Sequence, residues 1–147
     1  MKINRMTVVT LGVADLQRAT NFYREVLTVS PNTSHGGVTF FEMQGVWLSL
    51  YPLVELAKDI APNVPAEPVP FGGFTLAHNA RSKDEVTTIL NRVEAHGERI
   101  AKAAADTFWG GFGGYFADPD GHYWEVVYGD MFEFDAQGGL LPSREVK

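Results

Sequence analysis

The stretch Val8–Leu27, VVTLGVADLQRATNFYREVL, decides the fold, because a strand pattern and a helix pattern follow each other in it directly. Thr7–Val13 is rich in β-branched residues, which favours a β-strand. Asp15 is a typical N-cap for the helix that follows. The apolar positions of that helix recur with a period of about 3.6 residues. They are Leu16, Ala19, Phe22, Tyr23, Val26 and Leu27.

The same pattern returns later in the chain. Gly73–Asn79 favours a strand, and Ser82 is the N-cap of a helix that we expect to end at about Ala95. Val86 stands 67 positions after Ala19, and the other apolar positions of this helix keep that spacing. They are Ile89, Leu90 and Val93, which follow Phe22, Tyr23 and Val26. The chain therefore contains an internal repeat.

Each helix precedes a pair of strands. Val38–Met43 and Val46–Tyr51 are joined by a short turn at Gln44-Gly45. Gly113–Ala117 and Tyr123–Tyr128 form the second pair, and Tyr123–Tyr128 aligns with Val46–Tyr51 at an offset of 77. Between the repeats, Ala61–Pro70 is rich in proline and is expected to be a surface connection. The repeating unit is therefore expected to be βαβββ.

We expect one α+β domain over residues 1–147, built from two tandem βαβββ modules. The first module covers about 6–52, a connection covers about 53–72, the second module about 73–128 and a C-terminal tail 129–147. A helix covers one face of each sheet and leaves the other face bare. Two curved mixed sheets that face each other, within a chain or across a dimer, enclose a cavity in which a ligand would bind.

The composition limits the classes of partner that we expect for this chain. The net charge is −6, from 12 Lys+Arg and 18 Asp+Glu, so nucleic acid and anionic membranes are not expected partners. The chain has no cysteine, which excludes disulfides and thiolate chemistry of its own. No stretch reaches the roughly 20 apolar residues of a membrane span. With no signal-like segment at the N-terminus, we expect a cytoplasmic protein.

Two segments carry a resemblance to a known family. Val8–Leu16, followed by Thr20–Tyr23, resembles the opening strand and helix of the vicinal oxygen chelate superfamily (glyoxalase/bleomycin resistance protein/extradiol dioxygenase). Phe116–Glu125, FADPDGHYWE, is similar to its closing signature. The resemblance implies the paired modules, a cavity between them and often a divalent metal that acts as a Lewis acid. Family members include lyases, isomerases, dioxygenases, thiol transferases and metal-free antibiotic-binding proteins, and a homodimer is expected.

The family's metal positions can be tested residue by residue. They fall on Val8 and Leu48 in the first module and on Thr75 and Glu125 in the second. Glu125 alone is a good metal donor, and transition metals generally need about three protein donors. We therefore expect no cofactor and no metal at the usual place. His78 could add a donor only if a bulge turned it inward, because by alternation it points away from Thr75.

Glu125 is the first candidate functional residue, as a general base or a ligand contact, against the alternative of a structural carboxylate. His78 is a weaker candidate acid or base. The segment Phe108–Gly114 is either a mobile flap that carries aromatic rings over the cavity or a twisted strand entry with core aromatics. Asp118–Gly121 is expected to be a tight turn. The expected substrate-binding residues are Thr10, Leu48, Leu50, Thr75, Asn79, Trp109 and Tyr123.

Three functions remain open at this point. The first is a binder of a small hydrophobic or aromatic oxygenated molecule, favoured by the apolar cavity and the missing metal donors. The second is a lyase, isomerase or dioxygenase of the vicinal oxygen chelate type, with an unfamiliar metal set or with Glu125 as base. The third is an interaction domain that uses the concave face only to form a dimer. The identity of the ligand cannot be derived from the fold.

Overall fold

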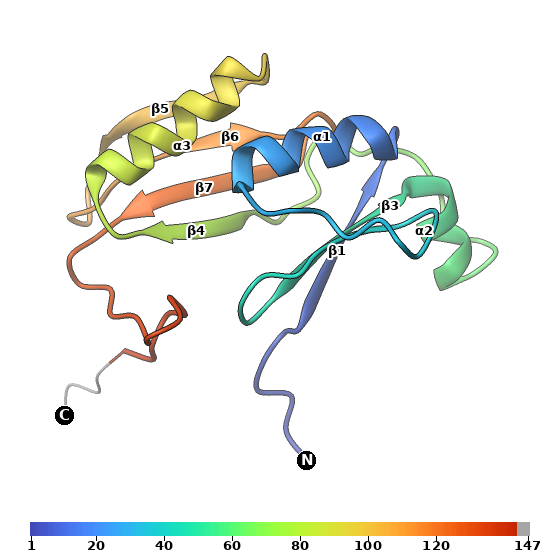
Figure 1. Cartoon of the computed structure of the whole chain (residues 1–147), viewed down its shortest axis with the longest axis horizontal. Helices are drawn as coiled ribbons and strands as arrows, with labels where there is room; N and C mark the ends of the chain where they lie inside the picture. Colours follow the sequence, from blue (N-terminus) through green and yellow to red (C-terminus); the bar gives the residue numbers. More distant parts are fainter. Residues whose placement is uncertain (144–147) are drawn as a thin grey trace. The chain divides into compact units, whose positions relative to one another are not determined.

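The computed structural model describes residues 1–143 of the chain. The chain divides into two compact units, Met1–Pro70 and Phe71–Lys147, and each is described by itself. Both combine helices with a mixed β-sheet, which confirms the expected α+β class (Figure 1). Within residues 1–143, none of the helices has the length and apolar character needed to cross a membrane.

The first unit contains a three-stranded sheet of order β1-β3-β2. β1 (Val8–Val13) runs parallel to β3 (Trp47–Pro52), and β2 (Thr39–Phe41) runs antiparallel to β3. Between β1 and β2 lies α1 (Leu16–Leu27), and β3 is followed directly by α2 (Leu53–Ile60). Parallel β1 and β3 require a crossover, which α1 and the loop after it supply.

The first unit departs from βαβββ in two places. The strand expected before β2 is reduced to one bridge, in which Asn32 pairs with Phe40. The helix α2 was not predicted, because the sequence interpretation assigned these residues to the connection. Leu53 of α2 packs against Gly12, where an added Cβ would come within 2.6 Å of Leu53 Cδ1. Glycine at position 12 therefore allows α2 to approach β1.

The second unit contains the complete βαβββ module. β4 (Leu76–Ala80) is followed by α3 (Lys83–Ala95), and then by β5 (Ile100–Asp106), β6 (Phe112–Ala117) and β7 (Tyr123–Tyr128). The sheet order is β4-β7-β6-β5, with β4 parallel to β7 and the other pairs antiparallel. β4 begins three residues later than the sequence predicts, so Thr75 precedes the strand.

The two main helices begin as the sequence predicts. The carboxylate of Asp15 accepts the Arg18 backbone N–H at 3.0 Å, and the hydroxyl of Ser82 accepts the Glu85 N–H at 3.0 Å. Such side-chain caps satisfy backbone donors that have no partner within the helix. Thr28 ends α1 in a left-handed conformation, with φ of 54°.

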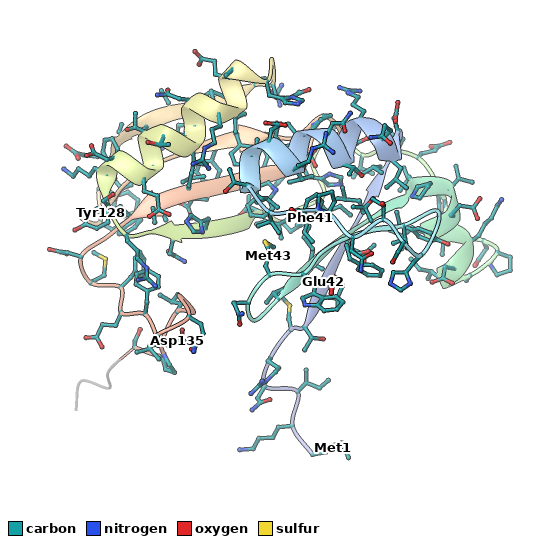
Figure 2. The ribbon with its side chains drawn as sticks, viewed as in Figure 1. Met1, Phe41, Glu42, Met43, Tyr128 and Asp135 are labelled. Atoms are coloured by element: carbon teal, nitrogen blue, oxygen red, sulfur yellow. The ribbon has the colours of Figure 1, made fainter. Side chains whose placement is uncertain are left out.

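Each unit has its own core between helix and sheet. In the first, the ring of Tyr23 in α1 meets that of Phe41 in β2 edge-on at 6.2 Å, and Phe22 packs against Tyr23. Phe41, which is labelled in Figure 2, is fully buried. In the second, Phe116 and Trp124 stack in parallel with ring centroids 5.9 Å apart. The remaining buried apolar residues of the helices and strands are Leu11, Val13, Ala19, Val26, Leu48, Leu50, Ala57, Ala80, Val86, Leu90, Val93, Ala117, Val126 and Val127.

The helix repeat at an offset of 67 is confirmed, because α1 begins at Leu16 and α3 at Lys83. The offset of 77 between the last strands is wrong by one. Thr10 pairs with Ser49 in the first unit, and Ala77, 67 positions after Thr10, pairs with Glu125 in the second. Ser49 therefore occupies the place of Glu125, at an offset of 76. Aligning Trp47 with Trp124 shifted the alignment of the two last strands by one residue. The pairing between strands, and not the similarity of the side chains, determines which face a residue takes.

Candidate functional site

The sheet of the second unit has one face under α3 and an opposite face, here called the second far face. It carries Ala77 and Asn79 of β4, Gly113 and Tyr115 of β6, and Tyr123, Glu125 and Val127 of β7. The side is set by alternation, because Gly114 lies against Leu90 of α3 and pairs with Val126, so the neighbours of Val126 in β7 point the other way. Glu125 therefore lies on the far face, as expected.

A phenol–carboxylate pair occupies the middle of this face. Tyr115 is the cross-strand partner of Glu125, and its hydroxyl donates to Glu125 Oε2 at 3.1 Å. Burial raises the pKa of the Tyr115 phenol, and the charge of Glu125 and the hydrogen bond to it raise the pKa further. Tyr115 is thus held protonated, as a hydroxyl that can donate to a carboxylate or to a ligand oxygen.

Lys102 pairs with Tyr115 on the β5 side of this pair, and the surroundings on the β4 side are small and mostly apolar. Ala77 lies beside Glu125, and Asn79 lies beside Val127 in the next row. Across from Val127 stands Gly113, where an added Cβ would meet Val127 Cβ at 2.8 Å and the Val126 carbonyl at 2.6 Å. This end of the face therefore has no room for a side chain at position 113.

Tyr123 lies at the other end of β7, also on the second far face. Its hydroxyl accepts a hydrogen bond from the Arg99 guanidinium at 3.1 Å, and Phe71 packs against its ring with centroids 6.0 Å apart. Thr75, expected in the same region, is exposed and lies just before β4.

His78 lies on the α3 side of the sheet, as alternation predicts. Its Nε2 is 2.9 Å from Glu85 Oε1 in α3. Burial alone would raise the pKa of Glu85, but the Arg81 backbone N–H and the hydrogen bond and charge of His78 outweigh it and lower the pKa. His78 is therefore separated from Glu125 by the sheet, and the bulge that would turn it inward does not occur.

The first unit has a corresponding first far face, opposite α1. It carries Val8, Thr10, Phe40, Trp47, Ser49 and Tyr51. The prediction that Leu48 and Leu50 line this face is wrong: they are 2% and 0% exposed and lie on the α1 side. The hydroxyls of Thr20 in α1 and Thr39 in β2 are 2.8 Å apart, and Thr39 pairs with Leu50. Cross-strand partners share a face, so Leu50 faces the helix with Thr39. Leu48, two residues earlier in the same strand, faces the helix as well.

This register changes the residues at the family's metal positions. Ser49 takes the place that the sequence interpretation gave to Leu48, so the set becomes Val8, Ser49, Thr75 and Glu125. Val8 has no donor atom, and hydroxyls are poor ligands for divalent metals without help from stronger donors. Within residues 1–143, no three His, Cys, Asp or Glu side chains group in a way that could hold a metal ion. These residues do not fit the metal that the family often binds.

Trp109 lies in a short turn between β5 and β6. The Thr107 N–H donates to the Gly111 carbonyl at 2.8 Å, and the Gly111 N–H donates to Thr107 Oγ1 at 2.7 Å. The Trp109 ring lies over Gly111 and meets Phe132 of the tail, with ring centroids 6.0 Å apart. It is 39% exposed. The segment is therefore a hydrogen-bonded turn supported by the tail, and its aromatics do not belong to the core.

The turn before β7 is built around a buried carboxylate, which confirms the expected tight turn. Asp118 Oδ1 accepts the backbone N–H groups of Asp120 and His122 at 2.9 and 2.8 Å, and Oδ2 is 2.8 Å from His122 Nδ1. Burial alone would lower the pKa of His122, but the hydrogen bond and charge of Asp118, with Asp120, outweigh it and raise the pKa. The interaction orients His122 and holds the turn.

Tyr115, Ser49 and Arg99 were missed as site residues. The signal for Tyr115 was present, because Ala117 and Tyr123 flank the Asp118–His122 turn and counting outward places Tyr115 opposite Glu125. Ser49 was lost with the one-residue alignment error. Arg99 precedes β5, a strand whose alanine-rich sequence carries no strong strand signal.

Comparison with known proteins agrees with this fold. The sequence profile of the Glyoxalase/Bleomycin resistance protein/Dioxygenase superfamily matches residues 3–126. Metallothiol transferase FosB from Shouchella clausii (strain KSM-K16) is 26% identical over 139 residues, 89% of this chain and 84% of that protein. A glyoxalase-related enzyme from Fulvimarina pelagi superposes with a TM-score of 0.86 at 31% identity, over 97% of this chain and 100% of the other. The fosfomycin resistance protein FosX from Listeria monocytogenes has a TM-score of 0.69 at 23% identity, over 88% and 97% of the two chains.

Proposed function

We propose that this chain, which belongs to the Glyoxalase/Bleomycin resistance protein/Dioxygenase superfamily, binds a small hydrophobic or aromatic oxygenated molecule on the far face of its second module. The proposal includes binding without the divalent metal that the family often uses. The observation that carries it is the Tyr115–Glu125 pair, whose hydroxyl and carboxylate are hydrogen-bonded to each other beside the small side chain of Ala77.

The pair supplies the polar contacts that a small oxygenated ligand needs. A carboxylate accepts hydrogen bonds, so Glu125 suits a ligand hydroxyl or enol. The Tyr115 hydroxyl can turn from Glu125 to a ligand carbonyl at little cost, because one donated bond replaces another. Ligand sites commonly combine a few such polar groups with apolar walls.

Apolar area supports a hydrophobic or aromatic ligand body. On the second far face, exposed Ala77 lies beside Glu125, while Val127 in the next row is buried. Phe71, 62% exposed, packs against the Tyr123 ring of the same unit with ring centroids 6.0 Å apart. Exposed apolar patches of this kind are typical of binding surfaces.

The donor set at Val8, Ser49, Thr75 and Glu125 supports the metal-free part of the proposal. A site with one carboxylate and two hydroxyls competes poorly with water for a divalent ion. The metallothiol transferase activity named for the FosB relative is therefore not carried over to this chain.

A second candidate is a metal-free enzyme that moves a proton on the same ligand. The hydrogen bond between Tyr115 and Glu125 favours it, because a carboxylate next to a protonated phenol can serve as a base beside an acid. Turnover of a bound compound in the wild-type protein and its loss in Glu125→Gln would establish this second function.

The test of binding compares two matched carboxylate variants. Glu125→Gln removes the charge on the far face, and Glu94→Gln removes one from α3. Phenols, catechols and hydroxyketones are screened by saturation-transfer NMR, and hits are titrated by calorimetry. A hydrogen bond to a charged group contributes about 1.5–3 kcal/mol, so we expect Glu125→Gln to weaken binding about tenfold or more.

Glu94→Gln should bind the same compounds as the wild type. Equal affinity of the wild type and Glu125→Gln for every hit would contradict the proposal. So would the absence of hits combined with a dimer held together through the far faces, which would favour an interaction domain.

A further inference from the structure

The second module holds a basic side chain that the Tyr115–Glu125 pair does not use. The Arg99 guanidinium donates to Tyr123 Oη at 3.1 Å, and its Cζ lies 5.8 Å from the centre of the Tyr123 ring. Phe71 contacts the same ring. Arg99 is exposed, yet it has a defined position against an aromatic ring, which both the hydrogen bond and the cation–π contact favour.

Arg99 lies on the same face as Glu125. Its carbonyl accepts the Ala117 backbone N–H at 3.0 Å, and Ala117 is the partner of Tyr123. These three residues form one row across the sheet, so the Arg99 side chain reaches Tyr123 by crossing Ala117. The next residue, Ile100, pairs with Phe116 of the core, which sends Arg99 to the opposite side.

Among residues 1–143, Arg99 has no acidic partner. In the described part of the chain, residues 1–143, the ion pairs are formed by other basic groups, and Arg99 forms none. Acidic residues outnumber basic ones by 18 to 12, so acids are not scarce. Lys102, the register partner of Tyr115, also forms no ion pair there. As far as the described residues show, the β5 side of the second far face therefore carries two positive charges without an acidic partner, and one of them, Arg99, is bonded to a tyrosine hydroxyl.

We propose that Arg99 and Tyr123 bind an oxyanion of the ligand, which narrows the ligand to a small apolar acid that carries a carboxylate or sulfonate group. The inference rests on the proposed function and specifies its ligand. A guanidinium presents a planar fork of donors that matches two oxygens of such a group. The Tyr123 hydroxyl, now an acceptor from Arg99, can also donate to the anion.

Glu125 gives the bound acid an orientation. It lies in the row next to Tyr123, and its negative charge repels a second anion while it accepts from a hydroxyl. The anionic end of the ligand therefore lies at Arg99 and an uncharged oxygen at the Tyr115–Glu125 pair. The chemistry that fits both ends is a hydroxy acid or an enolised keto acid with an apolar body.

Two fluorescent probes test the inference, because they share one aromatic body and differ in charge. 8-Anilino-1-naphthalenesulfonate carries a sulfonate, and N-phenyl-1-naphthylamine lacks it. Both are titrated against the wild type, Arg99→Met and Arg92→Met, which removes the same charge from α3. Arg99→Met should weaken the sulfonate probe about tenfold and leave the neutral probe within about twofold, and Arg92→Met should change neither.

Further variants distinguish a direct contact with the sulfonate group from a nonspecific electrostatic attraction. Arg99→Lys keeps the charge without the fork and should restore part of the affinity. Tyr123→Phe keeps the ring and should weaken only the sulfonate probe. Sodium sulfate should displace the sulfonate probe no better than sodium chloride of equal ionic strength, because a free inorganic anion lacks the apolar body.

Three results would overturn the inference. Equal weakening of both probes in Arg99→Met would show a structural role, and equal weakening of the sulfonate probe in Arg99→Met and Arg92→Met would show a nonspecific charge effect. If the wild type binds the neutral probe, and Arg99→Met binds the sulfonate probe as tightly as the wild type does, this inference is refuted and the proposed function is not. Failure of the wild type to bind either probe contradicts the proposed function and the inference with it.

Discussion

Leu48→Ala tests the register of the first sheet, on which the placement of Ser49 and the missing metal donors depend. Leu48 is 2% exposed on the α1 side and pairs with Phe41. The substitution removes three buried carbon atoms. At about 0.8 kcal/mol per methylene, the lost free energy of burial is about 2.4 kcal/mol. The unfilled cavity adds to this, so we expect a total loss of about 3–4 kcal/mol of unfolding free energy.

The assay is urea unfolding followed by far-ultraviolet circular dichroism. With a slope of about 2 kcal/mol per molar urea, the midpoint should fall by about 1.5–2 M with an unchanged slope. Val8→Ala, on the first far face and 46% exposed, is the control and should cost less than about 1 kcal/mol. A loss in Leu48→Ala that is no larger than in Val8→Ala would refute the register and return Leu48 to the first far face.

Three further predictions concern the turn, the far face and a helix cap. The pKa of His122 is raised on folding, so the stability from its bond to Asp118 is fully present below the unfolded pKa of about 6.5 and is lost as pH rises through the folded pKa. Urea midpoints measured from pH 6 to 9 should fall more steeply for the wild type than for His122→Asn, and parallel curves would contradict this. Gly113→Ala forces Cβ to within 2.6 Å of the Val126 carbonyl and should cost about 1–3 kcal/mol in the same assay; an unchanged midpoint would show that β6 lies elsewhere. Asp15→Ala removes the cap of α1 and should cost about 1 kcal/mol, against no loss in Asp15→Asn.

The elements with strong local signals could be predicted from the sequence. The caps at Asp15 and Ser82 and the apolar spacing of α1 and α3 lie in the expected places, because helix ends and faces are set by nearby residues. The tight turn at Asp118 was also predicted, since proline followed by Asp-Gly strongly favours a turn. Family membership followed from the same segments, and the match over residues 3–126 confirms it.

The parts that failed depend on pairing between distant strands. In β3, the run Trp47–Tyr51 has large or apolar side chains on both faces, so alternation alone does not show which face is buried. The hydrogen bond between Thr20 of α1 and Thr39 of β2 shows which face of the sheet lies under the helix. It joins residues 19 positions apart, so local sequence does not reveal it. Likewise, β5 is recognisable as a strand only through its pairing with β6. The candidate site was therefore half predicted: Glu125 was placed on the right face, and its partner Tyr115 was not.

The central claim is the proposal that this family member binds its ligand without the usual metal, because Val8, Ser49 and Thr75 stand where the resemblance to the family places metal ligands. Metal content per chain, measured by inductively coupled plasma mass spectrometry, tests this most directly. The protein is prepared without tag or chelator, incubated with zinc, nickel, iron and manganese ions, and desalted. Metal far below one ion per chain is the predicted result. A near-stoichiometric content of any of these metals would contradict the claim and make a metal-dependent enzyme the better account.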